Sequence, residues 1–175
     1  QEIEIRLGLA DRVLAAGEHL WGESFHLGQQ EADRQHEHAA FLAWLLQQIQ
    51  EQAVDVVIVA GDVFDTASPP SHAREAYLQL ALAVRDGGAQ LVVLGGNHDS
   101  PAVLGEARSL LQRLHTWVVP SLDGEVADHV LCLPGRDGTP GMLLCAVPFI
   151  RAREVRSSLP GQDSEQRRQD MMAGI

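Results

Sequence analysis

Two short apolar runs, rich in valine, isoleucine and leucine, constrain the fold of this 175-residue chain more than any other feature. The first covers residues 54–60, the second covers residues 91–94, and a glycine follows each. Such runs are typical of strands that are buried on both faces, because a solvated face would show polar residues at alternate positions. The runs begin about 35 residues apart, which leaves room for a crossover helix. The pattern therefore predicts parallel strands in an α/β fold.

Helical patterns fill the chain around these runs. Phe41, Leu45 and Ile49 recur at four-residue spacing and predict a helix over residues 32–52. Proline and glycine residues at the predicted ends indicate two further helices. Other short apolar runs predict three more strands, and two of these flank a hairpin loop. These helices cover 71–85 and 101–113, and the strands cover 3–9, 129–133 and 142–147. Residues 10–30 show no clean period, and the polar tail from residue 157 predicts the start of another helix.

The composition is that of a folded domain with an acidic surface. Apolar residues make up 45% and charged residues 21% of the chain, and no apolar run is long enough to cross a membrane. The net charge is −11 and all 13 basic residues are arginine, which argues against holding nucleic acid by bulk positive charge. An acidic protein can still contact the phosphate groups of a nucleic acid through bound metal ions, because the ions supply the positive charge. Two cysteines, Cys132 and Cys145, predict buried free thiols in a reducing cytoplasm.

Polar residues follow both buried runs at the point where each predicted strand ends. Residues 61–65 read Gly-Asp-Val-Phe-Asp, and residues 95–99 read Gly-Gly-Asn-His-Asp. Because parallel sheets bind ligands beyond the carboxyl ends of their strands, we expect the two segments to form one site. Either segment alone is more often an ordinary turn, whereas the two at the ends of consecutive strands favour a metal-dependent phosphoesterase site.

The residue types in these segments suit two-metal hydrolysis. The carboxylate of Asp62 can bridge two divalent cations, and the amide oxygen of Asn97 is a neutral ligand suited to Mn²⁺ or Mg²⁺. Two such ions would activate a water molecule and hold the attacking and leaving oxygens of a phosphoester. His98 is the candidate catalytic residue, as proton donor to the leaving group or as stabiliser of phosphoryl charge. Asp99 is the candidate that orients its imidazole.

Other polar clusters have weaker signals. The His-Glu-His run at 36–38 places its two histidines on different sides of a helix, which favours a solvated helix start over a metal pair. The cluster of Arg151, Arg153 and Arg156 suits contact with DNA phosphate or, equally, a solvated charged face.

The two glycine-led segments together resemble the signature pair of the calcineurin-like metallophosphoesterases, Gly-Asp-x-x-Asp followed by Gly-Asn-His-Asp. The residues around them are similar to the branch of that family that contains the nucleases of DNA double-strand-break repair. The Asp-Thr-x-Ser-Pro-Pro-Ser sequence at 65–71 is specific to that branch. The resemblance runs from about residue 37 to residue 154, and its longest matches are 59–71, 90–100, 136–141 and 147–151.

This resemblance implies an α/β fold in which the chain forms the N-terminal half of a metallophosphoesterase β-sandwich flanked by helices. It implies a Mn²⁺-dependent nuclease, with Mg²⁺ as the alternative ion, that acts as an exonuclease on double-stranded DNA ends and as an endonuclease on single strands and hairpins. It also implies a homodimer within a heterotetramer, together with an ATPase subunit, in DNA repair and recombination. By resemblance, Asp62 bridges the metals, Asn97 is a metal ligand and His98 is the catalytic imidazole.

The beginning of the chain departs from the family pattern. The family begins with a strand that ends in Asp-x-His, and this chain has no such sequence. One alignment places Glu18 at the position of that aspartate, and another places Asp11 there, but neither restores the histidine. We therefore expect residues 1–30 to be an atypical segment, as a shifted reading frame or foreign start would produce.

The later histidine ligands of the family come after the point where this sequence stops. We accordingly expect residues 31–156 to be the N-terminal part of the metallophosphoesterase domain and 157–175 to begin a truncated helical segment. A truncated and impaired nuclease subunit, with weak Mn²⁺ binding, is the resulting expectation. The alternatives are a non-catalytic fragment and a general phosphoesterase that acts on nucleotides.

Overall fold

The computed structural model describes residues 5–7, 13–16, 29–135 and 138–151. The predicted tail helix and most of the unassigned segment 10–30 lie outside these ranges, as do Asp11 and Glu18. Within the described ranges, no helix is both long and apolar enough to cross a membrane.

A five-stranded sheet forms the centre of the fold, with its strands in sequence order. The first strand runs antiparallel to the second, and the remaining neighbours are parallel, so the parallel pairing predicted for the two buried runs is confirmed. Val59 on the third strand pairs with Val93 on the fourth, and Val93 pairs with Val118 on the fifth. The strands are β1 (Ile5–Leu7), β2 (Val13–Ala16), β3 (Val56–Ala60), β4 (Gln90–Leu94) and β5 (Thr116–Val119).

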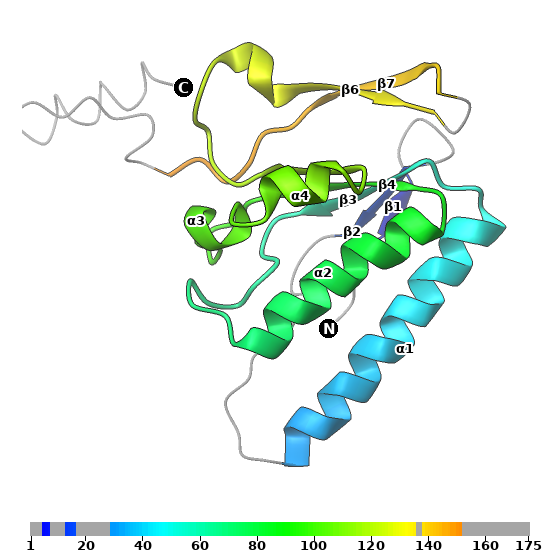
Figure 1. Ribbon diagram of the computed structural model, residues 1–175, viewed down its shortest axis with the longest axis vertical. Helices are drawn as coiled ribbons and strands as arrows, with labels where there is room; N and C mark the ends of the chain where they lie inside the picture. The colour runs from blue at the N-terminus through cyan, green and yellow to red at the C-terminus, as the bar shows by residue number, and fades with distance from the viewer. Residues whose placement is uncertain (1–4, 8–12, 17–28, 136–137, 152–175) are drawn as a thin grey trace, which may run out of the picture.

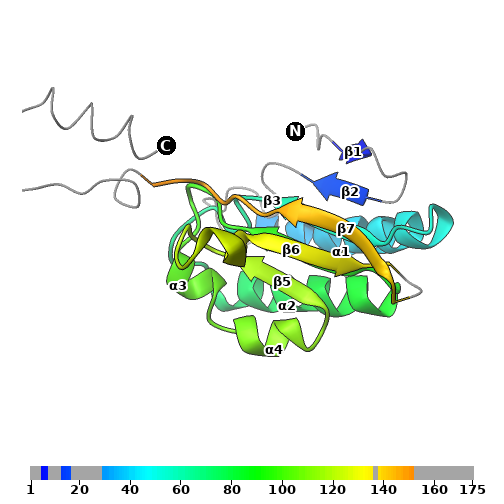
Figure 2. The ribbon, with the colours of Figure 1, turned by 90° about the horizontal axis from the view of Figure 1, so that it is seen from above.

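Helices cover one face of this sheet and a two-stranded ribbon covers the other (Figures 1 and 2). On the helical face, α1 (Gln29–Glu51) and α2 (Ser71–Asp86) bury the larger core, which includes Ile49, Leu80 and Val93. On the opposite face lies a smaller core that joins Val56 and Val92 of the sheet to Leu133 of the ribbon. The ribbon consists of β6 (Val130–Pro134) and β7 (Pro140–Cys145), which pair antiparallel.

The predicted third helix, 101–113, is in fact two short helices. They are α3 (Pro101–Leu104) and α4 (Arg108–Gln112), and Gly105 caps the first of them. Glycine is a poor residue for a helix interior, so an ending at Gly105 is less costly than continuation through it. Sequence reasoning also missed β2, β5 and the 3₁₀ turn η1 (Val126–His129).

The ribbon has one face toward the sheet and one toward solvent. Leu131, Leu133, Met142 and Leu144 pack against the sheet, in the alternation expected of strands. Cys132 and Cys145 lie on the outer face and are exposed free thiols. The prediction that the cysteines are free is confirmed and the prediction that they are buried is wrong, because their strand positions place them opposite the inward-facing leucines.

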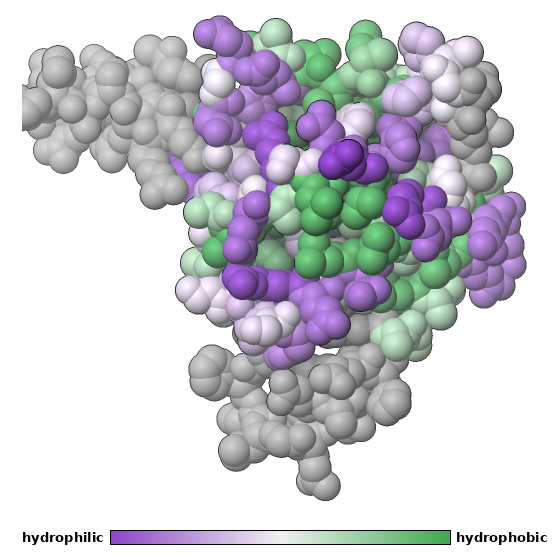
Figure 3. Space-filling model, viewed as in Figure 1, coloured by the Kyte–Doolittle hydropathy of each residue, from purple (hydrophilic) through white to green (hydrophobic). Residues whose placement is uncertain are grey.

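Apolar side chains also reach the surface of the helical layer. Figure 3 shows them gathered in the middle of the face that carries α2 and α4. Leu78 on α2 and Leu110 on α4 are among the exposed large apolar residues, at 38% and 58% exposure. Isolated exposed leucines are common on soluble proteins, so this feature alone assigns no role.

Candidate metal-binding site

The loops after β3 and β4 meet at one edge of the sheet, as the sequence predicts. Asp62 follows β3 with its backbone in the left-handed region, at a φ of 48°, directly after Gly61 at 112°. A non-glycine residue in this region costs conformational energy, and such outliers concentrate at functional sites. The strained turn brings the Asp62 carboxylate to the loop that follows β4, because Oδ1 accepts a hydrogen bond from the backbone N–H of His98 at 3.1 Å.

Glycine is required where these loops touch. A Cβ atom on Gly96 would lie 2.1 Å from both the backbone nitrogen and Oδ1 of Asp62. A Cβ atom on Gly95 would lie 2.2 Å from the carbonyl oxygen of Pro120, which follows β5. Both distances are far inside van der Waals contact, so the Gly-Gly pair lets three successive loops approach one another.

Asp99 joins the two loops through its buried side chain, which is 3% exposed. Its carboxylate accepts hydrogen bonds from the backbone N–H groups of Val63 at 3.1 Å, Phe64 at 2.9 Å and Gly96 at 2.8 Å. Burial raises the pKa of this carboxyl; the three N–H donors oppose the rise, and the nearby charge of Asp62 adds to it. These contacts run to backbone groups, and the role of Asp99 in orienting the imidazole of His98 stays a prediction.

The amide of Asn97 faces the carboxylate of Asp62. The amide atom on that side lies 3.0 Å from both carboxylate oxygens. With nitrogen in that place the amide donates to Asp62, and with oxygen in that place three oxygens converge as cation ligands. Neighbouring ligands of an octahedral Mg²⁺-sized ion lie about 3 Å apart. With oxygen in that place, the donor chemistry and spacing of this pair fit a hard divalent cation.

The imidazole of His98 lies beside this pair at the protein surface. Its Nδ1 is 3.0 Å from the carbonyl oxygen of Asp65. A carbonyl oxygen can only accept, so Nδ1 carries the hydrogen, and Nε2 lies 3.2 Å from the second amide atom of Asn97. Asp65, which follows Asp62 by three residues, thus supplies an orienting contact for the imidazole through its backbone carbonyl.

Arg151 reaches the same loop from the segment after β7. Its Nη2 donates to the carbonyl oxygens of Gly96 at 2.8 Å and of Asp99 at 2.7 Å. The guanidinium also lies 5.8 Å from the ring centroid of Phe149, in a cation–π arrangement. The side chain is half-buried against backbone carbonyls, so a fully solvated face does not describe Arg151, and its contact with DNA phosphate stays a prediction. Arg153 and Arg156 lie outside the described residues.

The structure brings together three of the predicted site residues. Asp62, Asn97 and His98 come together, while Asp11 and Glu18 lie in ranges of which the structure describes nothing. Among the described residues, no group of three or more histidine, cysteine, aspartate or glutamate side chains could hold a metal ion.

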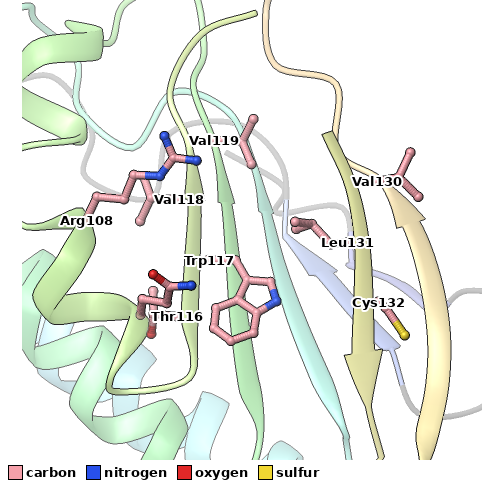
Figure 4. A pocket seen from close by; sticks show the side chains of 9 residues that line it. Arg108, Thr116, Trp117, Val118, Val119, Val130, Leu131 and Cys132 are labelled. Carbon is pink, nitrogen blue, oxygen red and sulfur yellow. The ribbon is translucent and has the colours of Figure 1, made fainter. Parts of the chain in front are cut away.

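A groove lies away from these loops, where the edge of the sheet faces the ribbon (Figure 4). It is lined by Arg108 and Gln112 of α4, by the whole of β5, and by Val130, Leu131 and Cys132 of β6. Neither Asp62 nor His98 lines it, so this groove is separate from the candidate site.

Comparison with known proteins agrees with the site. The calcineurin-like phosphoesterase family matches residues 25–158. The SbcD subunit of the SbcCD nuclease of Escherichia coli strain K12 is 47% identical over 159 residues, which cover 89% of this chain and 38% of that protein. The corresponding protein of Rhodobacter capsulatus is 34% identical, over 78% of this chain and 35% of that protein. The DNA double-strand break repair protein Mre11 of Methanopyrus kandleri is 28% identical over 41% of this chain.

The chain thus spans less than two-fifths of the length of the SbcD proteins that it matches. The family match, by contrast, covers most of the chain, including both loops of the candidate site. The chain belongs to the calcineurin-like phosphoesterase family.

Proposed function

We propose that this chain contributes to the active site of a metal-dependent DNA nuclease subunit of the SbcC–SbcD type. The observation that supports the proposal most directly is the meeting of Asp62, Asn97 and His98 at the edge of the parallel sheet. The similarity to the SbcD subunits of SbcCD nucleases supports the same activity. The proposed substrates are double-stranded DNA ends, single strands and hairpins.

We propose Mn²⁺ as the ion, with Mg²⁺ as the alternative, and Asp62 and Asn97 as residues that hold it. When bound, such an ion supplies Lewis acidity toward a phosphoryl oxygen. The chain's own contribution is preorganisation: the strained turn of Asp62 and the close contact at Gly96 fix both oxygen donors before the substrate arrives.

His98 acts on the phosphodiester directly in this proposal. Because Nδ1 donates to the carbonyl oxygen of Asp65, the ring is oriented with Nε2 as its reactive nitrogen. A proton on Nε2 can pass to the leaving oxygen, or the same N–H can stabilise charge on a phosphoryl oxygen. Asn97 and His98 are exposed, which suits a long substrate such as DNA.

The proposed partners follow from the similarity to SbcCD nucleases. We propose an SbcC-type ATPase subunit as the partner of the whole protein, in a heterotetramer built on a homodimer. Its setting would be DNA repair and recombination in the cytoplasm, where the free thiols of Cys132 and Cys145 stay reduced.

The deciding experiment compares a hairpin DNA with bis(p-nitrophenyl) phosphate, each with and without Mn²⁺. Cleavage of the hairpin that requires Mn²⁺ supports a nuclease, and hydrolysis of the small diester alone supports the general phosphoesterase. Asp62→Asn should remove both activities, because it weakens the metal site. A non-catalytic fragment predicts no Mn²⁺-dependent turnover at all and no effect of His98→Ala.

The two roles of His98 are separable with leaving groups. His98→Ala should lower turnover by about 10²- to 10⁴-fold on a phenyl ester, where departure needs a proton. On the matching p-nitrophenyl ester the loss should be small if His98 is a proton donor, because nitrophenolate leaves unaided. An equal loss on both esters would assign His98 to charge stabilisation.

A further inference from the structure

The loop with Asn97 and His98 is held from two sides, and only one side belongs to the two signature segments. On that side, the carboxylates of Asp62 and Asp99 accept from the N–H groups of His98 and Gly96. These contacts fix the donors of the loop backbone. The carbonyl groups of the same loop are bound by a segment that lies about 50 residues further along the chain.

That segment, Phe149–Arg151, follows the ribbon and passes beside the loop. The backbone N–H of Phe149 donates to the carbonyl oxygen of Gly95 at 2.8 Å. One nitrogen of Arg151, Nη2, donates to the carbonyl oxygens of both Gly96 and Asp99. The two residues between those carbonyls are Asn97 and His98, so Arg151 spans the stretch of backbone that presents the metal ligand and the imidazole.

Charge strengthens this arrangement. Hydrogen bonds from a guanidinium are stronger than neutral ones, and the half-buried setting reduces competition from water. The Phe149 ring, itself 49% exposed, lies against the guanidinium and limits its approach to solvent. Both residues come from outside the two signature segments, so the site extends beyond those segments.

We propose that Arg151 is a positioning residue of the phosphoesterase site, which holds Asn97 and His98 in place through the loop carbonyls. The expected loss of kcat rests on the proposed function. The expected effects on loop order and Mn²⁺ affinity can be measured without activity. Arg151 does not meet the substrate in this account, so its loss should lower kcat and Mn²⁺ affinity and leave KM for a small diester unchanged.

The test uses the whole chain with Arg151→Ala, Arg151→Lys and, as a charge-matched control, Arg74→Ala, which removes an exposed arginine paired with Glu106. Amide hydrogen exchange at His98 and Asp99 and the Mn²⁺ affinity, measured by electron paramagnetic resonance, do not require turnover. We expect Arg151→Ala to weaken Mn²⁺ binding and lower kcat by about 10- to 100-fold, with faster exchange in the loop. Arg74→Ala should match the wild type.

Arg151→Lys and added methylguanidinium provide the readouts that distinguish positioning from general stability. Lysine retains hydrogens for both carbonyls on a shorter side chain, so it should restore part of the loop protection; methylguanidinium should restore part of the Mn²⁺ affinity of Arg151→Ala. If Arg151→Ala does not fold, amide exchange of the loop in Arg151→Lys provides the test. Exchange faster than in the wild type supports the proposal, and exchange equal to the wild type contradicts it.

Two results would overturn the proposal. Unchanged loop exchange and Mn²⁺ affinity in Arg151→Ala would show that the hydrogen bonds do not position the loop. A rise in KM for DNA alone, with kcat and exchange unchanged, would assign Arg151 to direct phosphate contact. If the wild type shows no turnover, the proposed function fails, while exchange and Mn²⁺ binding still test the role of Arg151.

Discussion

At the scale of single residues, close contact between loops makes the site intolerant of added atoms. Gly96→Ala would place a Cβ atom 2.1 Å from the backbone nitrogen of Asp62, so the two loops must separate. We expect a loss of about 1–3 kcal/mol in the free energy of unfolding, together with weaker Mn²⁺ binding. Denaturant titration and Mn²⁺ titration measure the two effects.

Gly138→Ala is the control for this substitution. Gly138 has a φ of +77°, and a Cβ atom there would meet nothing within 4 Å. Its replacement should cost about 1 kcal/mol through backbone strain alone and leave Mn²⁺ binding unchanged. Equal Mn²⁺ affinity in Gly96→Ala and the wild type would contradict the steric account of the site.

Tyr77 is the only tyrosine of the chain, and its position leads to a prediction about alkaline pH. Its side chain is 4% exposed, packs edge-on against Phe64, and has no hydrogen-bond partner for its hydroxyl among the described residues. Burial, and next the negative charge of Asp99, raise its pKa above the ordinary value of 10. The unfolded chain therefore releases this proton first, and stability falls as pH rises above 10.

Tyr77→Phe should remove that dependence. At neutral pH the variant should be as stable as the wild type or more stable by about 1 kcal/mol, because a buried unbonded hydroxyl is lost. Above pH 10 the difference should grow by about 1.4 kcal/mol per pH unit. Tyrosinate absorbance during alkaline titration gives the pKa directly, and an ordinary value in the folded wild type would refute the prediction.

Three of the site residues were predictable from sequence and two contacts were not. Asp62, Asn97 and His98 follow strands whose apolar runs are unmistakable, so topology alone places them at one edge. The backbone contacts of Asp99 and Arg151 depend on how loops fold back on one another. No residue spacing encodes a hydrogen bond to a carbonyl group that lies 52 or 55 residues away.

At the scale of elements, the same contrast holds. Strands whose valine-, isoleucine- and leucine-rich runs end at a glycine, and helices with regular apolar stripes, were predicted within a few residues, as for β3, β4, α1 and α2. β2 ends in two alanines, which have low β-propensity, so its run is a weak signal. β5, Thr116–Val119, has strand-forming residue types in a run of four, but no glycine follows it, and it forms a strand through pairing with β4.

The ribbon offers a matched pair of leucines that tests its orientation. Leu133 on β6 is 1% exposed and faces the sheet, whereas Leu143 on β7 is 72% exposed and faces outward. Leu133→Ala should lower the free energy of unfolding by about 2–5 kcal/mol. Leu143→Ala should change it by less than about 0.5 kcal/mol. Similar losses in the two variants, measured by denaturant unfolding, would mean that the outer face of the ribbon is covered in solution.

At the scale of the whole molecule, the net charge of −11 opposes the approach of DNA, which is also negatively charged. Phosphate approaches an acidic surface only where positive charge is supplied, and a bound divalent ion is the largest local charge that a site of this kind acquires. We therefore expect binding of a fluorescent hairpin to require Mn²⁺ and to be absent in a chelator at low salt. Fluorescence anisotropy measures this, and tight metal-independent binding that weakens steeply with salt would contradict it.

Asp62→Asn separates the effect of charge from the effect of metal. The substitution makes the net charge less negative, so simple electrostatics predicts tighter binding of DNA to the variant. If the ion held by Asp62 mediates the contact, the variant should instead bind DNA more weakly in Mn²⁺ than the wild type does. Asp86→Asn removes one exposed carboxylate on the far end of α2 and serves as the control, since it makes the same change in charge without touching the site. Weaker binding by Asp62→Asn alone shows that the acidic surface is compatible with DNA because one of its carboxylates recruits the cation.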